Sequence, residues 1–525
     1  MKKLAYILSF FVIASCAQQS LLTGGEKDIK APVLNKEKTI PQNYSTDFSA
    51  EIIQLYFDEY VQLKDQKNNF FVNPTIEKIR LEEKGKSILI HLEEPLKEKT
   101  TYTFNFGSSI QDITENNPYT DFRYVLSTGS FIDSNFYRGS VYDAFTKKPL
   151  ENVKVLLYEK KLDSLTEKIS PNYLCNTNDA GNFILNNLKE GEYYVLAIGD
   201  ENKNNLPDPK NEKIAFNPNF INSLSLGDST TIKDTLLLFM QDNPLKIIDK
   251  NYTPPGKFNV IFNKKIAASD IKIDSINYFI QPRKFPSDTF SFWIDSIPNS
   301  PLFFQLTIEN ESFSKGLKIN TFASNSKDSS FAFKAKNINN IKINQPLKLL
   351  FNHPIKKINY KKLHLLIDST ETDFIDSFDG ALWSMLFPTI SNTELTFMAD
   401  PGAFESIYGQ KNDTIELIFK QKENSLYGDL FLNITCETCD QFIVQLINRE
   451  ALVTSFNCNE ESLIDTIPLC NPGSYQLRLI HDLNGDGEWT TGDFNSKTQP
   501  EPVYYYNEPM VVKSGWSLDI KWVIQ

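Results

Sequence analysis

One short sequence pattern occurs three times in this chain and constrains its fold more than any other feature. In each copy an apolar pair precedes a Phe, an Asp or Asn follows the Phe, and another apolar residue lies three positions further on. The copies run from Leu55 to Val61, from Val260 to Ile266 and from Leu349 to Ile355. Phe followed by Asp or Asn is also common wherever a strand ends. Three spaced copies nevertheless predict an internal repeat of sandwich modules.

Short alternating segments surround the first copy. Apolar and polar residues alternate, or nearly so, over Ile52 to Phe57, Ser87 to Leu92 and Tyr102 to Phe106, with turns between them. The chain contains 39 Phe and 22 Tyr against 5 Met, and aromatic and β-branched residues favour strands over helices. Strands at such short spacing predict a β-sandwich.

A second type of module is indicated between the repeats and at the C-terminal end. Gly and Asp turns separate short alternating strands after Arg138, and the segment ends in Gly191 to Leu196. The run from Pro472 to Ile480 repeats this arrangement. Both segments resemble the carboxypeptidase-regulatory or prealbumin-like sandwich, a domain that usually supports or recognises rather than catalyses.

The N-terminus predicts an export signal. Lys2 and Lys3 precede a short apolar run, which ends in Ile13-Ala14-Ser15-Cys16. Such a run is too short to span a membrane permanently. The segment resembles a bacterial lipobox, which implies that Cys16 becomes the acylated N-terminus of the mature chain. The alternative is an ordinary secretory signal with a chance cysteine.

A family resemblance adds to this prediction. The residues Gly24, Gly25, Lys27 and Asp28 follow the cysteine closely, and a strand then ends in Phe57 to Asp65. This combination resembles a group of Bacteroidetes outer-membrane lipoproteins that begin with a bacterial (SbsA-type) Ig-like domain. The resemblance implies a lipid-anchored protein of the outer membrane with an outer-membrane protein as partner. Ala17 replaces the Asp that would retain a lipoprotein in the inner membrane, and the membrane face stays open.

We therefore predict an all-β chain of serial β-sandwich modules, Ig-like and prealbumin-like, behind a lipoprotein signal peptide. The predicted segments are 1–15 (signal peptide), 16–41 (lipidated tether), 42–131 (bacterial Ig-like domain), 132–242 (carboxypeptidase-regulatory or prealbumin-like domain), 243–340 and 341–421 (two Ig-like sandwiches) and 422–525 (C-terminal prealbumin-like sandwich).

Two acidic loops follow the strands that end near Leu196 and Ile480. Asp482, Asn484, Asp486 and Asp493 match positions 1, 3, 5 and 12 of a calcium loop, Gly487 takes the turn position, and Glu488 offers its backbone carbonyl. The loop from Asp200 matches less well, because Asn205 occupies the glycine position and Asn211 the twelfth. The sequence thus predicts a structural Ca²⁺ ion at the later loop. A network of Asx turns without an ion is the alternative.

Six cysteines require a separate account. With Cys16 assigned to lipid and Cys175 isolated, four lie close together: Cys436, Cys439, Cys458 and Cys470. In an exported protein they predict two disulfides, with three pairings open. Zinc binding through Cys436-x-x-Cys439 is the alternative.

No catalytic motif is found in the sequence. Four histidines form no zinc-protease pattern, and neither a nucleophile elbow nor a phosphate loop is present, so we do not expect an enzyme. A net charge of -12 without a dense basic run argues against nucleic acid. Two functions are left: a scaffold or accessory subunit of an outer-membrane protein complex, or a surface lipoprotein that binds carbohydrate or another ligand.

Overall fold

The computed structural model describes residues 28–162, 168–223, 234–242, 244–274, 276–281, 287–295, 301–308, 313–321, 331–336, 338–339, 341–388 and 393–525. The predicted signal peptide, Cys16 and the tether up to residue 27 lie outside the described residues. The chain divides into two compact units: Met1–Gln241 with Thr491–Pro500, and Asp242–Thr490 with Glu501–Gln525. We call them unit 1 and unit 2.

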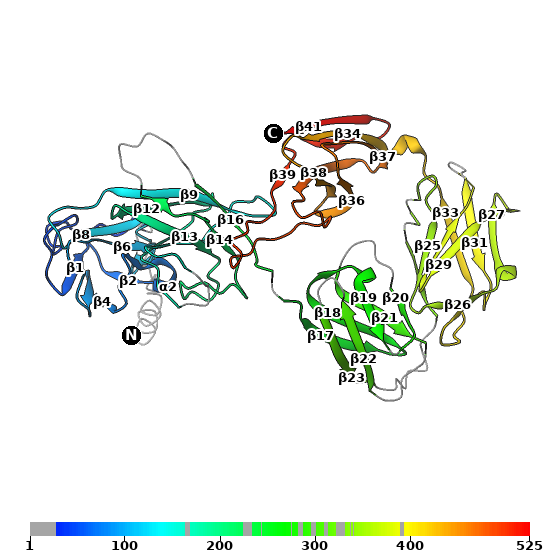
Figure 1. Cartoon of the computed structure of the whole chain (residues 1–525), viewed down its shortest axis with the longest axis horizontal. Helices are drawn as coiled ribbons and strands as arrows, with labels where there is room; N and C mark the ends of the chain where they lie inside the picture. The colour runs from blue at the N-terminus through cyan, green and yellow to red at the C-terminus, as the bar shows by residue number, and fades with distance from the viewer. Residues whose placement is uncertain are drawn as a thin grey trace, which may run out of the picture. The chain divides into compact units, whose positions relative to one another are not determined.

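The predicted all-β fold is confirmed. Strands form a series of sheets along the described part of the chain (Figure 1). These sheets enclose five separate apolar cores among the described residues. The Phe of each sequence repeat, Phe57, Phe262 and Phe351, is buried in the core of its own sandwich. The repeated pattern therefore marks a strand residue whose aromatic ring turns inward: at the strand end for Phe57 and Phe351, and within β18 for Phe262.

The first sandwich of unit 1 consists of sheets β1-β5-β4 and β3-β6-β8 and the pair β2-β7, with one short helix, α2. In β1, Ile53 and Leu55 are buried while the residues between and beside them are not, which is the alternation that a half-covered sheet requires. The elements are β1 (Ile52–Tyr56), β2 (Val61–Leu63), α2 (Gln66–Asn69), β3 (Phe71–Asn73), β4 (Ile79–Lys84), β5 (Ser87–Leu92), β6 (Thr101–Gly107), β7 (Ile110–Asp112) and β8 (Phe122–Ser127).

The second sandwich of unit 1 packs sheet β12-β9-β16 against sheet β11-β10-β13-β14, and β15 also pairs with β13. Its last strand, β16, runs parallel to its first strand, β9. The strands are β9 (Asn135–Asp143), β10 (Lys154–Tyr158), β11 (Tyr173–Asn176), β12 (Asn182–Leu188), β13 (Glu192–Ile198), β14 (Ile214–Phe216), β15 (Ile221–Asn222) and β16 (Asp234–Leu238).

Hydrogen bonds to backbone groups join the two sandwiches of unit 1. The side chain of Asn73 donates to the carbonyl of Leu174 and accepts from its N–H, both at 2.8 Å. The N–H of Thr75 donates to the carbonyl of Asn172 at 2.9 Å. A buried amide that pairs with a backbone in this way fixes the two sandwiches against each other, because breaking the pair would leave polar groups without partners.

The third sandwich, in unit 2, consists of sheets β17-β18-β21-β20 and β19-β22-β23. Its strands are β17 (Ile247–Thr253), β18 (Lys257–Ile266), β19 (Ile271–Asp274), β20 (Tyr278–Ile280), β21 (Ser287–Ile294), β22 (Leu302–Ile308) and β23 (Phe313–Ile319), and a 3₁₀ turn, η1 (Ala268–Asp270), precedes β19.

The fourth sandwich consists of sheets β24-β25-β30-β29 and β28-β27-β31-β33 and the pair β26-β32. Its elements are β24 (Phe333–Lys336), β25 (Leu347–Phe351), β26 (Ile355–Ile358), η3 (Tyr360–Lys362), β27 (Leu363–Ile367), β28 (Thr370–Glu371), β29 (Ile375–Asp379), β30 (Leu382–Leu386), β31 (Glu394–Ala399), β32 (Phe404–Ser406) and β33 (Ile415–Lys420). One boundary differs from the prediction. Strand β24 pairs with β25, and Phe331 stacks on Phe351, so these residues belong to the fourth sandwich rather than to 243–340.

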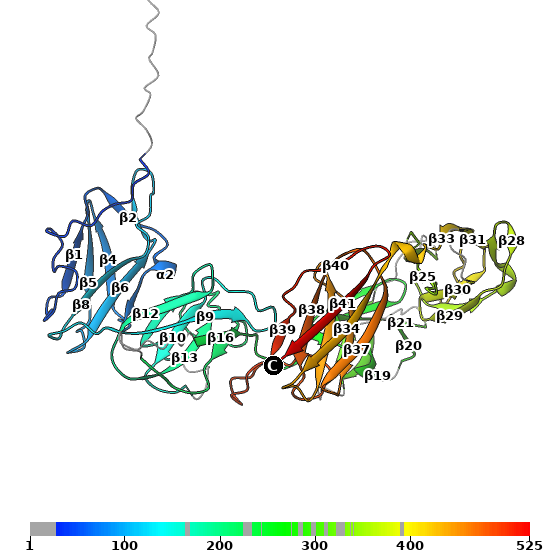
Figure 2. The ribbon, with the colours of Figure 1, turned by 90° about the horizontal axis from the view of Figure 1, so that it is seen from above.

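The fifth sandwich repeats the topology of the second. Sheet β37-β34-β41 faces sheet β36-β35-β38-β39, β40 also pairs with β38, and the last strand again runs parallel to the first (Figure 2). The elements are η4 (Asn424–Leu426), β34 (Gly428–Cys436), β35 (Phe442–Asn448), β36 (Ala451–Cys458), β37 (Ser462–Cys470), β38 (Gly473–His481), β39 (Val503–Tyr505), β40 (Met510–Val512) and β41 (Ser517–Ile524).

Candidate functional site

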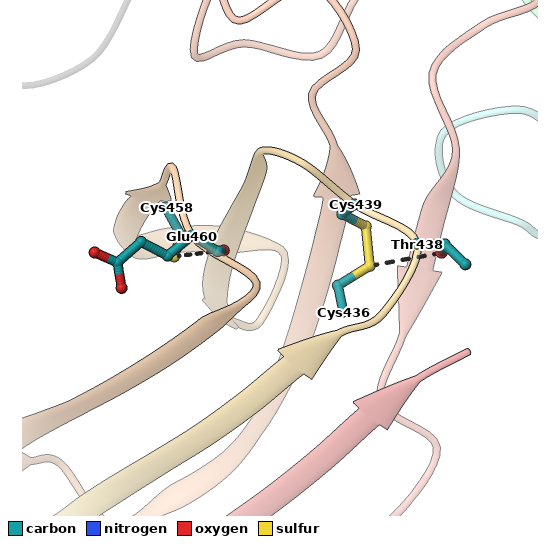
Figure 3. The surroundings of a disulfide bond; sticks show 5 residues. All are labelled: Cys436, Thr438, Cys439, Cys458 and Glu460. Carbon is teal, nitrogen blue, oxygen red and sulfur yellow. Dashed lines mark hydrogen bonds between the residues drawn. A yellow bond between two sulfur atoms is a disulfide. The ribbon is translucent and has the colours of Figure 1, made fainter.

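The clustered cysteines form one disulfide. Cys436 and Cys439 are bonded at the end of β34, and Cys458 lies apart from them (Figure 3). Cys458 and Cys470 are free thiols. The second predicted disulfide is therefore not formed. Sγ of Cys458 lies 3.3 Å from the carbonyl of Ser462, where β37 begins, and Cys470 ends that strand. Eight residue steps along a strand span roughly 26 Å, far beyond the ~7 Å that a disulfide allows between Cα atoms.

Two of the free cysteines in the described residues, Cys175 and Cys470, are held as thiols by burial. Burial raises the pKa of the Cys470 thiol to about 11 and that of the Cys175 thiol to about 12, so both thiols stay protonated at neutral pH. The disulfide leaves Cys436 and Cys439 without a thiolate for zinc. Across the described residues, no group of three His, Cys, Asp or Glu side chains is arranged to hold a metal ion.

The histidines lie apart from one another. His91 and His364 each contact one glutamate at 2.8 Å, Glu82 and Glu371 respectively, and both pairs lie on strands. His353 is buried against Phe331 and Tyr408. These are structural positions, and none of the three pairs with a nucleophile.

The later acidic loop, residues 482–501, connects β38 to β39. Oδ1 and Oδ2 of Asp482 accept from the N–H groups of Gly485 and Gly487, at 2.7 and 2.9 Å. Oδ1 of Asp486 accepts from the N–H of Glu488, and Oδ1 of Asn484 accepts from the N–H of Asp486. This is the network of Asx turns that the sequence left open as the alternative to calcium.

The fifth predicted calcium ligand has a different role. Asp493 belongs to unit 1, whereas Asp482 to Glu488 belong to unit 2, so the structure does not define one site that contains all five residues. Residues 491–500, which we call the insert hairpin, form a tight turn in which Asp493 and Thr498 exchange backbone hydrogen bonds of 2.9 Å. Oδ1 of Asp493 accepts from the N–H of Asn495 and from the side chain of Gln241.

The earlier acidic loop, residues 200–212, connects β13 to β14. The carboxylates of Asp200 and Glu212, at its two ends, are 6% and 3% exposed. Oδ1 of Asp200 accepts from the N–H groups of Asn204 and Asn205, and Oε1 of Glu212 accepts from the N–H of Asn202. Both carboxylates are thus directed into the loop that they close.

The sequence analysis missed the closing glutamates. Glu212 and Glu501 each lie two residues before the strand that follows, β14 and β39. They escape a search by calcium-loop spacing because the second loop contains the insert hairpin and is longer. The signal that could have found them is their position before the next strand rather than their distance from the first aspartate.

A cleft of about 1240 Å³ opens between the two sandwiches of unit 1. Seven asparagines line it: Asn69, Asn73, Asn105, Asn176, Asn178, Asn182 and Asn186. Arg123 and Arg138 add two positive charges, and Asp121 adds one negative charge. Phe71 is half-buried in the lining, whereas Phe122 and Phe183 are buried. The sequence analysis did not predict this cleft, because its residues come from strands of two different modules.

Comparison with known proteins identifies the first module. Residues 28–128 match the family model of the bacterial Ig-like domain. They contain the whole first sandwich, so we use this family name for that module. No curated protein matches the chain. The described residues include no helix long and apolar enough to cross a membrane.

Solved structures of low similarity were also found. The S-layer protein SbsC, residues 31–844, is 9% identical over 88% of this chain and 66% of that one, with a TM-score of 0.15. The major pilin subunit of Bacillus cereus is 12% identical over 74% of this chain and 99% of that one, with a TM-score of 0.12. We draw nothing further from likeness at this level.

Proposed function

We propose that this chain is a non-catalytic outer-membrane lipoprotein, anchored through acylated Cys16, that acts as a multi-domain scaffold or accessory subunit of an outer-membrane protein complex. The anchor and the compartment follow from the signal sequence and the family resemblance. The resemblance of residues 132–242 and 422–525 to a prealbumin-like sandwich, a domain that usually supports or recognises, favours recognition over catalysis. One surface of the described structure carries the proposal.

That surface is the outer face of sheet β37-β34-β41. Phe431, Ile464 and Val523 are 41%, 78% and 46% exposed. Their register partners Thr466, Asn433 and Thr435 lie on the same face, opposite the buried side of the sheet. Both β37 and β41 are edge strands. Asp519 and Lys521 also lie on this face, opposite Phe431 and Asn433. Exposed apolar side chains among polar and charged ones are typical of a non-obligate protein interface, and an edge strand can extend the contact by backbone pairing.

The test is affinity purification of the tagged chain from native membranes, followed by mass spectrometry. We expect a stable outer-membrane partner with the wild type and its loss in the F431E/I464E double variant. The I375E variant is the matched control, because Ile375 is 74% exposed on the fourth sandwich. Recovery of the same partner with the double variant, or of none with the wild type, would contradict the scaffold function.

The cleft of unit 1 favours a second candidate function, the capture of an acidic saccharide. Amide side chains and arginines are suited to hydroxyl and carboxylate groups. Arg123 is exposed, so its guanidinium is accessible from solvent.

Titration with defined uronic-acid and neutral oligosaccharides separates the two functions. If the cleft captures acidic glycans, R123A weakens their binding at least ~tenfold, about 1.4 kcal/mol, while R449A, a change at an exposed turn, has no effect. Absence of saccharide binding, or equal binding by R123A, excludes this candidate.

A further inference from the structure

The two acidic loops occupy equivalent places in modules of the same topology. Each follows the third strand of the larger sheet, β13 or β38, and precedes the short strand that pairs with it, β14 or β39. Asp200 corresponds to Asp482, since each begins its loop. Glu212 corresponds to Glu501, since each lies two residues before the next strand. The chain therefore provides its own comparison between two versions of one loop.

In the later loop the carboxylate oxygens at both ends are satisfied by backbone N–H groups. Asp482 uses both oxygens in this way. Oε1 of Glu501 accepts from the N–H of Leu483 at 2.7 Å, and Oε2 accepts from the N–H of Thr490 at 2.8 Å. Each of these buried carboxylate oxygens thus already has a donor that compensates its charge.

The earlier loop lacks this compensation. Oδ2 of Asp200, Oε2 of Glu212 and Oδ1 of Asn205 are buried, and no described group donates a hydrogen bond to them. No described group makes the hydrogen bond to Oε2 of Glu212 that the N–H of Thr490 makes to Oε2 of Glu501. Three acceptor oxygens are thus left open within one stretch of thirteen residues, two of them on carboxylates that are more than nine-tenths buried.

An uncompensated buried carboxylate is costly, and the molecule has only a few ways to relieve it. Burial raises the pKa of Glu212, and the negative charges of Asp200 and Asp208 raise it further. The N–H groups of Asn202 and Asp208 oppose this rise. The ammonium of Lys154 attracts the charge of Asp200, but its Nζ lies over the Phe71 ring, 5.5 Å from the centroid. A bound cation would compensate both carboxylates together.

We propose that the earlier acidic loop binds one Ca²⁺ ion, with Asp200, Glu212 and Asn205 as its side-chain ligands, and that the later loop binds none. Calcium accepts a mixed set of carboxylate, amide, carbonyl and water oxygens in flexible geometry, whereas magnesium requires a nearly ideal octahedron. Two carboxylates give a site of low charge. Its dissociation constant is therefore about 10⁻⁴ to 10⁻³ M, the range of extracellular calcium modules.

Calorimetric titration of the full mature chain with CaCl₂, after EGTA treatment and dialysis, tests this assignment. We expect one ion per chain for the wild type and for D482N, the matched change in the later loop. We expect affinity at least ~tenfold weaker, about 1.4 kcal/mol, in D200N and E212Q, which preserve side-chain shape. MgCl₂ replaces CaCl₂ in a parallel titration.

A second measurement, the melting temperature with Ca²⁺ and with EGTA, tests the assignment even if a variant is poorly folded. Ca²⁺ raises the melting temperature of the wild type over that in EGTA. In E212Q the melting temperature in EGTA is higher than that of the wild type, because the buried charge is gone, and Ca²⁺ adds nothing. Absence of calcium binding by the wild type, equal response to magnesium, or loss of binding in D482N instead of E212Q would each overturn the proposal.

Discussion

His353 is a buried imidazole in the fourth sandwich, and it makes the stability of unit 2 sensitive to pH. Its ring stacks on Phe331, with centroids 6.4 Å apart, and meets the edge of Tyr408 at 5.4 Å. Burial lowers the pKa of His353 below its usual value, although the side chain of Gln410 opposes the shift. The folded state therefore holds the imidazole neutral at a pH where the unfolded chain already binds a proton.

The sign of the effect follows from proton linkage. Below about pH 6.5 the unfolded state binds more protons than the folded state, so stability falls as the pH falls toward the depressed pKa. We expect the urea midpoint of the wild type to decrease between pH 7.5 and pH 5.5 more than that of H353F. The H364Q variant controls for loss of a histidine elsewhere. Equal decreases in wild type and H353F would refute the assignment.

Single residues also show how far the sequence could be interpreted. The buried positions of Phe57, Phe262 and Phe351 follow from local alternation, because the pattern places each ring on the covered side of its strand. The roles of Glu212 and Glu501 do not follow, because they depend on which N–H groups reach a carboxylate from across a loop. Partners of this kind are set by the folded path of the chain and leave no local pattern.

The insert hairpin is an element whose position depends on one aromatic ring. Phe494 is fully buried and packs at its edge against Phe216, with centroids 5.3 Å apart, and Tyr194 lies nearby. A Cβ on Gly492 would approach the ring of Phe239 to 2.6 Å, so only glycine allows this contact. Nζ of Lys497 lies 3.1 Å from the centroid of the Phe494 ring. These contacts all lie within unit 1.

We expect F494A to release the insert hairpin from the rest of unit 1. Truncation of a buried Phe costs about 3–5 kcal/mol of stability, more than the remaining hydrogen bonds of a ten-residue turn can offset. Trypsin should then cut after Lys497 readily in F494A and slowly in the wild type, as followed by mass spectrometry of the early fragments. F431A, which truncates an exposed Phe, should keep Lys497 protected. Equal protection in F494A would show that the hairpin is held in another way.

Elements are the level at which the sequence analysis failed most clearly. Strand β24 pairs with the module that follows it, because Phe331 and Phe333 both contact Phe351. The hairpin with Asp493 lies in unit 1 although its neighbours in sequence lie in unit 2. The direction of β37 carries Cys470 away from Cys458. In each case a contact between segments far apart in the sequence decides the structure. The spacing of residues along one sequence does not show which distant segments pair.

The organisation of the whole chain was more accessible to sequence reasoning. Alternation and the repeated pattern are local, and they were sufficient for the all-β class and for a series of sandwiches. The resemblance between residues 132–242 and 422–525 corresponds to a shared strand order, including the parallel last strand. The cleft of unit 1 could not be predicted, because it exists only where two modules meet.

The parallel pairing of β9 with β16 has a mechanical consequence. The bacterial Ig-like domain is attached at the start of β9, and the chain continues to unit 2 from the end of β16. Tension applied along the chain would pull these neighbouring strands in opposite directions, so their backbone bonds are loaded in shear. Bonds loaded in shear resist together, whereas bonds at a peeled edge break one after another.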